Sequence, residues 1–295
     1  MSLERFRAIA PDIKLNEPMS LHTSFKVGGP ADIYIAAAGE DQLRNLVLEA
    51  QRTDTPYFVI GNGSNILVSD KGIRGMVIQI DIKSIRIDGT IMYVGAGTLM
   101  SQIAAEAART ELTGFETFSG IPGTLGGGIF MNAGAYGGEL KNVIRSVRYM
   151  DDNGDVFDIR GQDCEFGYRT SIFSKGNKYI ISAEIELEKG NETDIRAAMA
   201  DYNKRRSDKQ PLSFPSAGSV FKRPEGHFAG ALIEAAGLKG YRIGGAEVSE
   251  LHAGFIINRG GATASDVLAL IEYIKKAVFE KSGILLEPEI RIMGE

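Results

Sequence analysis

The stretch SGIPGTLGGGIFMNAGAYGG, residues 119–138, decides how this chain is interpreted. Eight of the 19 residues from Gly120 to Gly138 are glycine, and none is Lys or Arg. Glycine inside regular structure costs roughly 0.5–1 kcal/mol per residue relative to Ala. Apolar residues are interleaved where a flexible linker would be polar. We therefore interpret the segment as backbone that a large flat or phosphorylated ligand approaches closely, rather than as a flexible loop.

A second glycine cluster, GNGSN at residues 61–65, directly follows a short apolar strand that we expect at 57–60. Glycines there permit positive φ, so that successive N–H groups point into one concavity and hold an anion. The cluster lacks the third glycine of the dinucleotide fingerprint and the lysine of a phosphate loop. A tight turn explains this cluster taken alone equally well. Together the two loops indicate an elongated ligand with a central diphosphate, and a dinucleotide such as FAD fits that description.

Bulk properties limit the remaining possibilities. With 295 residues the chain is long enough for two or three domains. The net charge of −5 argues against nucleic acid as the main partner. The single cysteine, Cys164, has no internal disulfide partner and fits a reducing compartment. The chain shows neither an export segment nor the ~20 apolar residues that a membrane span needs. We expect a cytoplasmic protein with no membrane partner.

The hydrophobic pattern predicts an α+β fold. Expected strands lie at 31–35, 57–60, 84–95 (a hairpin turning at Asp88-Gly89), 147–149 and 156–158 (a second hairpin, flanking Asn153-Gly154), 179–187 and 287–292. Expected helices lie at 41–51, 98–109 with Thr98 as the cap, 192–206, 228–236 and 265–281, the last ending at Gly283. The predicted division has three lobes, at 1–83, 84–207 and 208–285, with a strand at 286–295 returning to the first lobe.

Six motifs occur in one order along the chain. They are HTSFKVGGPA at 22–31, the two glycine loops, GYRTSIF at 167–173, AGSVFK at 217–222 and LEPE at 286–289. Any one of them alone is weak, but together they closely resemble the MurB family of UDP-N-acetylenolpyruvoylglucosamine reductases. Only 49 residues, 170 to 218, separate Arg169 from Ser219. The chain therefore resembles the shorter branch, which lacks an insertion in the substrate-binding region.

The resemblance implies a fold and a reaction. The first two lobes form an FAD-binding module of the p-cresol methylhydroxylase type, and an α+β third lobe binds the substrate. Non-covalently bound FAD takes a hydride from NADPH and passes it from flavin N5 to UDP-N-acetylglucosamine enolpyruvate. The product is UDP-N-acetylmuramate, a peptidoglycan precursor. We expect a monomer or weak dimer. We also expect no metal, because no histidine has metal-ligand spacing with another ligand.

Residues of the two glycine loops are the implied cofactor contacts. They are Gly61, Asn62, Gly63, Ser64, Asn65, Gly120, Pro122, Gly123, Thr124, Gly126, Gly127, Asn132, Ala133 and Gly134.

Three residues are implied in catalysis. Hydride addition to an enol ether beside a carboxylate develops negative charge, which fixed polar groups must stabilise. By resemblance, Arg169 holds the carboxylate side, Ser219 donates the proton and Glu289 assists near the enolate carbon. Taken singly, each has an ordinary explanation: a surface ion-pair arginine, a loop serine and a solvated glutamate.

The remaining implied residues contact the substrate: Tyr168, Arg205, Lys209, Lys222, Arg223 and His252. The basic ones flank the serine motif and would neutralise a diphosphate. Solvated lysines, helix-terminal arginines and a packed histidine remain the alternatives.

Two other functions stay open from sequence. One is an oxidase or dehydrogenase of the same fold with a covalently tethered flavin, which is weakened because the histidines and Cys164 lie outside both glycine loops. The other is a non-catalytic flavin- or nucleotide-binding protein, against which only the family resemblance argues.

Overall fold

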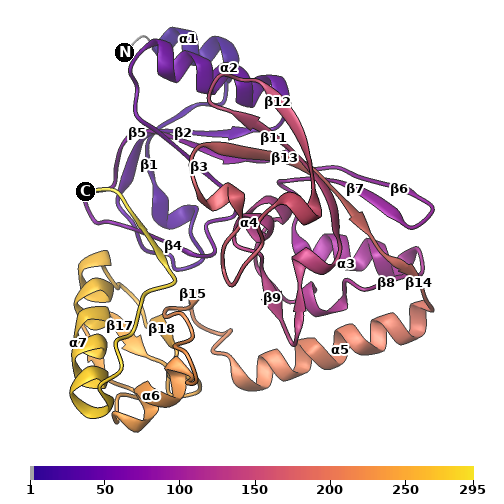
Figure 1. Cartoon of the computed structure of the whole chain (residues 1–295). Coiled ribbons are helices and arrows are strands. Elements are labelled where there is room, and N and C mark those ends of the chain that lie inside the picture. Colours follow the sequence, from indigo (N-terminus) through magenta and orange to yellow (C-terminus); the bar gives the residue numbers. More distant parts are fainter. Residues whose placement is uncertain (1–2) are drawn as a thin grey trace. The chain divides into compact units, whose positions relative to one another are not determined.

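The computed structural model describes residues 3–295, which form two compact units. The first unit contains residues 3–14, 33–62 and 76–206. The second contains residues 15–32, 63–75 and 207–295. The boundaries of the three predicted lobes stay a prediction. Figure 1 shows the chain coloured along its sequence.

An antiparallel five-stranded sheet forms the centre of the first unit, in the order β12-β11-β13-β7-β6. Its strands are β6 (Ile85–Asp88), β7 (Ile91–Gly95), β11 (Ile144–Asp151), β12 (Val156–Arg160) and β13 (Lys178–Glu186). The hairpins β6–β7 and β11–β12 turn where Asp88-Gly89 and Asn153-Gly154 predict them. Both predicted hairpins are therefore confirmed.

A four-stranded sheet has the order β1-β2-β5-β3, with β3 and β5 parallel. Its strands are β1 (Lys14–Pro18), β2 (Pro30–Ala37), β3 (Tyr57–Ile60) and β5 (Ile73–Ile80). Short pairs complete the first unit: β8 (Leu112–Thr113) with β14 (Glu188–Lys189), and β9 (Gly134–Ala135) with β10 (Gly138–Glu139). The sequence analysis did not anticipate six of these strands: β1, β5, β8, β9, β10 and β14.

Helices of the first unit bury apolar side chains, although the last of them, at residues 192–209, buries only Ile195. They are α1 (Leu3–Ile9), α2 (Glu40–Arg52), α3 (Met100–Arg109), α4 (Leu125–Phe130) and α5 (Glu192–Lys209), whose last residues belong to the second unit. Helix α2 buries the predicted stripe, Leu43, Leu46, Val47 and Ala50. Thr98 is not the cap of α3, because the helix begins at Met100 and the Thr98 hydroxyl donates instead to the Ser84 carbonyl at 3.3 Å.

The second unit is built on the antiparallel sheet β15-β18-β17-β16, and on the parallel pair β4–β19. Its elements are β4 (Ile66–Val68), β15 (Ser216–Ser219), α6 (Ala229–Ala235), β16 (Arg242–Ile243), β17 (Ala246–Val248), β18 (Phe255–Asn258), α7 (Ala264–Ser282) and β19 (Arg291–Met293). The predicted strand at 287–292 was wrong at its start. Residues 287–290 follow a path with one isolated bridge, and strand pairing begins at Arg291.

Helix α7 gives this unit its core. Its predicted stripe is buried: Val267, Leu270, Ile271, Ile274 and Val278. Thr263 caps the amino end by accepting from the Asp266 N–H at 3.0 Å, and Gly283 ends the helix at φ 71°. Asp70, 194 residues away in sequence, also accepts from the Ala264 N–H at 2.7 Å. The helix is thus fixed to the loop that follows β4.

Candidate active site

The two glycine loops meet within the first unit. The Asn62 side-chain amide donates to the Pro122 carbonyl at 3.0 Å. A Cβ on Gly61 would lie 2.8 Å from Thr124 Oγ1 and 3.8 Å from the Cα of Gly127. Because the backbones approach this closely, a side chain at position 61 would press against the second loop. Gly61 and Asn62 therefore lie against the second loop, as binding of one ligand by both loops requires.

Thr124 stands out in this surface because its side chain is buried, yet its hydroxyl has no hydrogen-bond partner among residues 3–295. It is the N-cap residue of α4, but its hydroxyl does not cap the helix. A buried polar group without a partner costs roughly 1–3 kcal/mol, so native structures seldom leave one. A hydroxyl that meets a bound group here would escape that cost, which fits an acceptor such as a phosphate oxygen.

Backbone contacts hold the second glycine loop in place. The Gly123 carbonyl accepts from the Met100 N–H at 3.0 Å, and the Gly126 N–H donates to the Ala96 carbonyl at 2.9 Å. Helix α3 and the end of β7 therefore position the loop before any ligand arrives.

Asn132 fixes the far end of this loop. Its side-chain amide donates to Glu139 Oε2 and to the Gly167 carbonyl, both at 3.0 Å, and its Oδ1 accepts from the Lys141 N–H at 3.0 Å. The side chain is 1% exposed, so these contacts use it fully. Any cofactor contact from residues 132–134 would thus come from the backbone, including Ala133 and Gly134.

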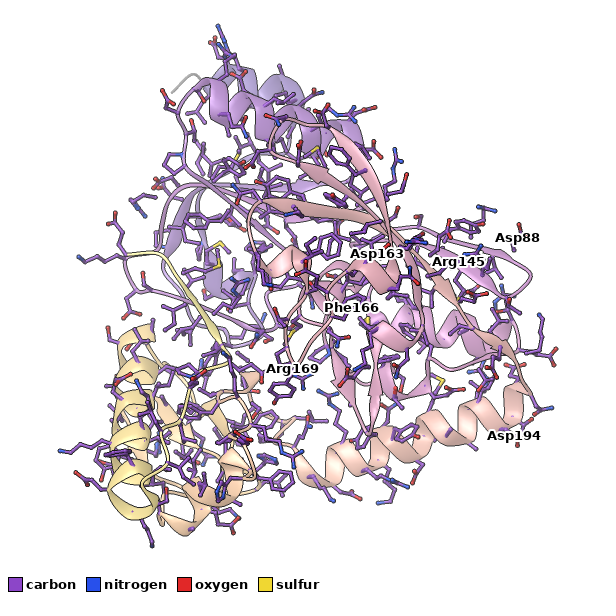
Figure 2. The ribbon with its side chains drawn as sticks, viewed as in Figure 1. Asp88, Arg145, Asp163, Phe166, Arg169 and Asp194 are labelled. Carbon is purple, nitrogen blue, oxygen red and sulfur yellow. The ribbon has the colours of Figure 1, made fainter. Side chains whose placement is uncertain are left out.

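Arg169 lies at the corner of a tight turn closed by Gly167 and Thr170, where the Gly167 N–H donates to the Thr170 carbonyl at 3.0 Å (Figure 2). Its φ of 54° is left-handed, a conformation that is uncommon for a residue with a side chain. Its guanidinium donates to the Gly134 carbonyl at 3.4 Å and lies 5.4 Å from the ring centre of the exposed Tyr168. The turn therefore places Arg169 against the glycine loop.

The rest of the first cluster belongs to the second unit. The Gly63 carbonyl accepts from the Ser24 N–H at 3.2 Å, which fixes the loop to the HTSF motif. The Asn65 side chain donates to the Glu289 carbonyl at 3.3 Å, and the Asn65 carbonyl accepts from the Arg291 N–H at 3.0 Å. Ser64, between them, is partly exposed.

Ser219 and Glu289 lie side by side in the second unit, although 70 positions separate them. Phe221 and Pro288 form an antiparallel bridge, and the Glu289 N–H donates to the Val220 carbonyl at 2.7 Å. Both side chains are partly exposed. Two of the three predicted catalytic residues are thus brought together here, while Arg169 lies in the other unit.

His252 belongs to the same group. Its Nδ1 accepts from the Gly254 N–H at 3.1 Å, while the Ser219 hydroxyl approaches the carbonyl of Gly254 at 3.5 Å. Burial lowers the pKa of His252 below its usual value, so the ring is neutral at pH 7. With Nδ1 accepting, the ring proton resides on Nε2, which makes His252 a donor from that atom.

The basic residues predicted to contact the substrate have different surroundings. Lys222 pairs with Glu287 at 3.2 Å, and the Arg223 guanidinium lies 3.9 Å from the ring centre of Phe228. Arg205 pairs with Asp201 at 2.7 Å on α5. Lys209, the last residue of α5, is exposed.

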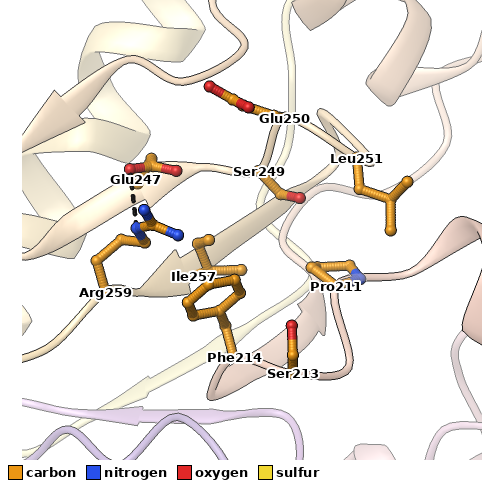
Figure 3. Close-up of a pocket in the computed structure, with 9 residues that line it drawn as sticks. All are labelled: Pro211, Ser213, Phe214, Glu247, Ser249, Glu250, Leu251, Ile257 and Arg259. Atoms are coloured by element: carbon orange, nitrogen blue, oxygen red, sulfur yellow. Dashed lines mark ion pairs between the residues drawn. The ribbon is translucent and has the colours of Figure 1, made fainter.

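A pocket in the second unit was not predicted. It measures ≈ 230 Å³ and is lined by Pro211, Ser213, Phe214, Glu247, Ser249, Glu250, Leu251, Ile257 and Arg259 (Figure 3). Glu247 is buried and pairs with Arg242 and Arg259, each at 3.4 Å. The sequence signal for this pocket was Glu247 in the short apolar strand β17, because a buried carboxylate needs a cation beside it.

The fold and the paired glycine loops define an FAD-dependent oxidoreductase with a p-cresol methylhydroxylase-type FAD-binding module and a further α+β domain. Residues 31–160 match the family "FAD binding domain", and residues 210–293 match "UDP-N-acetylenolpyruvoylglucosamine reductase, C-terminal domain". The chain belongs to the UDP-N-acetylenolpyruvoylglucosamine reductase family.

Individual relatives agree over nearly the whole length. The chain is 53% identical to the reductase of Caldanaerobacter subterraneus subsp. tengcongensis, covering 95% of this chain and 93% of that one. It is 51% identical to the reductase of Clostridioides difficile, covering 96% and 94%. The crystal structure of the Thermus caldophilus reductase matches with a TM-score of 0.81 and 34% identity, over 95% of this chain and 98% of that one.

Within the part of the chain that the structure describes, no helix is long and apolar enough to cross a membrane.

Proposed function

We propose that this protein reduces UDP-N-acetylglucosamine enolpyruvate to UDP-N-acetylmuramate, with NADPH as the hydride source. The observation that carries the proposal is the pairing of Ser219 with Glu289 through the Phe221–Pro288 bridge. The chain that holds this pair is 53% and 51% identical to two UDP-N-acetylenolpyruvoylglucosamine reductases. That pairing provides a proton donor and a carboxylate close together, which suits protonation of a carbanion.

The two glycine loops are proposed to hold FAD. Its diphosphate would accept from the Thr124 hydroxyl and from backbone N–H groups of residues 61–65 and 120–127. The N–H groups of Ile121, Leu125 and Gly126 are exceptions, because they donate to backbone carbonyls of the protein. The unsatisfied hydroxyl and the close loop-to-loop approach support this fit. Bound there, FAD would supply hydride transfer from NADPH to the substrate.

The protein's own residues would manage charge and the proton. Addition of hydride to the methylene carbon of the enol ether leaves negative charge on the neighbouring carbon and its carboxylate. Arg169 is proposed to neutralise that carboxylate, because a guanidinium fork matches two oxygens. Ser219 is proposed to deliver the proton to the carbon, with Glu289 polarising the site. His252, neutral and donating from Nε2, is proposed to bind a polar group of the substrate.

The remaining substrate contacts are proposed to involve Tyr168 and the basic residues Arg205, Lys209, Lys222 and Arg223, which would offset the UDP diphosphate. A cytoplasmic location and a monomer or weak dimer complete the proposal. The location is supported by the single cysteine, Cys164, which has no internal disulfide partner and fits a reducing compartment.

Ser219→Ala tests the proposal. We expect FAD binding and NADPH oxidation in single turnover to persist, while turnover of the sugar nucleotide falls by about 10²–10⁴. Ser101→Ala, at an exposed position on α3, is the matched control and should leave both unchanged. Undiminished turnover in Ser219→Ala would remove Ser219 from the mechanism. A protein that binds FAD but does not consume the enolpyruvyl substrate would refute the proposed reaction itself.

A further inference from the structure

The HTSF motif, residues 22–25, connects the first glycine cluster to the strand that carries Ser219. The Ser24 N–H donates to the Gly63 carbonyl at 3.2 Å. The Ser24 hydroxyl donates to the Ser216 carbonyl at 2.7 Å, across 192 positions of the sequence. Ser216 is the first residue of β15 and Ser219 is the last. A single serine therefore links the proposed cofactor loop to the proposed proton donor, and all of these residues belong to the second unit.

The motif and the glycine loop are packed closely on each other. Gly63 has a left-handed φ of 64°, which suits a residue without a side chain. A Cβ on Gly63 would overlap the His22 carbonyl oxygen and would lie 3.1 Å from the Cα of Thr23. The loop at residues 63–65 thus rests directly on the backbone of the motif, and a movement of one would displace the other.

Strand β15 is irregular just before Ser219. It pairs with β18 alone, with Ser216 opposite Ile257 and Ser219 opposite Phe255. Three steps along β15 therefore oppose two along β18, which is a bulge of one extra residue. Gly218 lies in the bulge with φ 77°, and a Cβ there would meet nothing within 4 Å, so this glycine serves the backbone conformation. Because a bulge changes the direction of the next side chain, the direction of Ser219 depends on how firmly Ser216 is held.

Other contacts keep the motif in place without the Ser24 hydroxyl. Phe25 is fully buried in the core of the second unit. The Asn258 side chain donates to the Phe25 carbonyl at 3.2 Å, and the Asn258 N–H donates to the Pro215 carbonyl at 2.9 Å. Removal of the Ser24 hydroxyl would thus leave the motif folded and its backbone contact with the glycine loop intact. Only the carbonyl at the start of β15 would lose its hydrogen bond from the motif.

We propose that Ser24 is a positioning residue, whose hydroxyl sets the distance between the cofactor loop at 63–65 and the proton donor Ser219. The proposed reaction requires this distance to be fixed, because the hydride from FAD and the proton from Ser219 must reach neighbouring carbons of one double bond. A displacement of about 1 Å costs such a step roughly 10²-fold. The inference rests on the proposed function and gives Ser24 a role that the family resemblance did not assign.

The test compares Ser24→Ala with Thr23→Val, a matched control in the same motif. The Thr23 hydroxyl is buried and donates to the Val27 carbonyl at 3.0 Å, so it joins the motif to neither the glycine loop nor β15. Three quantities are measured on each protein: the Kd of FAD, the rate of flavin reduction by NADPH, and the rate at which the reduced protein forms UDP-N-acetylmuramate in a single turnover. The last rate is measured in H₂O and in D₂O.

Ser24→Ala should slow product formation roughly 10- to 100-fold. The ratio of the rates in H₂O and D₂O should rise, because delivery of the proton becomes the slow step. The Kd of FAD and the rate of flavin reduction should stay close to those of the wild type, because the contact with Gly63 is made by the backbone. Ser24→Thr keeps the hydroxyl and should restore product formation. Thr23→Val should lower the Tm and leave all three quantities unchanged.

Ser24→Cys decides the question if Ser24→Ala does not fold, because its thiol has a similar volume but donates weakly. Its rate of product formation should lie below that of the wild type, again with a larger solvent isotope effect. Product formation at the wild-type rate in these variants would overturn the inference. An equal loss of FAD binding and flavin reduction would also overturn it, by showing a role in stability alone. A wild-type protein that does not convert the enolpyruvyl sugar nucleotide would refute the proposed function instead, so the two failures are distinguishable.

Discussion

Thr124→Val should make the cofactor-free protein more stable and the FAD complex weaker. Valine has nearly the shape of threonine and is also β-branched, so the backbone at the start of α4 is unchanged. The Thr124 hydroxyl neither caps α4 nor forms a hydrogen bond with another described group, so its removal breaks no hydrogen bond within residues 3–295. The substitution therefore isolates a single buried hydroxyl.

The expected changes in apoprotein stability and in FAD affinity both depend on whether the Thr124 hydroxyl has a hydrogen-bond partner. An unsatisfied buried hydroxyl costs roughly 1–3 kcal/mol. At the lower end of that range, the apoprotein should gain about 1 kcal/mol of stability. That corresponds to about 2–4 °C in Tm for a unit of 150–250 residues. A hydrogen bond to a charged phosphate contributes roughly 1.5–3 kcal/mol, so the Kd of FAD should rise roughly 10- to 150-fold.

The assay is thermal unfolding of the apoprotein, followed by FAD titration of the same sample. Thr98→Val is the matched control, because Thr98 is equally buried but its hydroxyl donates to the Ser84 carbonyl. That control should destabilise the apoprotein by about 1 kcal/mol and leave FAD affinity nearly unchanged. A Thr124→Val apoprotein that is less stable than the wild type and binds FAD as tightly would refute the reasoning.

Two further predictions concern stability. Partial burial of Asp70 is outweighed by hydrogen bonds from Ser265 and Ala264, and its pKa is lowered. The Asp70 carboxylate therefore stabilises the folded state fully above its unfolded pKa of about 3.9. This stabilisation is lost as the pH falls through the lower pKa of the folded state. Asp70→Asn should lower the free energy of unfolding by about 0.5–1 kcal/mol at pH 7 and by almost nothing near pH 2. Urea unfolding at the two pH values measures this difference. An equal decrease at both pH values would contradict the prediction. Asn132→Ala should lower stability by about 2–3 kcal/mol, because it leaves buried groups of the loop unsatisfied, and a Tm within 1 °C of wild type would show that the loop is held otherwise.

Local elements were predictable because their determinants are local. The stripe on α7 and the Gly283 terminus follow from a 3.6-residue period and a positive φ. The hairpins at Asp88-Gly89 and Asn153-Gly154 follow from turn chemistry. The prediction of Thr98 as a helix cap was wrong because its hydroxyl donates to the Ser84 carbonyl. The rules for helix starts do not include such a tertiary contact. Strand β5 was missed because its run of buried residues has no alternation to identify it.

The sequence by itself determined that glycine-rich segments without cations would contact an extended ligand, and its ordered motifs indicated the family. Only the tertiary structure decided how the groups meet. It joined Asn62 to Pro122, left the Thr124 hydroxyl without a partner and brought Ser219 beside Glu289. It also joined the Ser24 hydroxyl to the Ser216 carbonyl. The physical reason is that composition and periodicity act over a few residues, whereas the partner of a buried polar group is selected by packing between segments far apart in the chain.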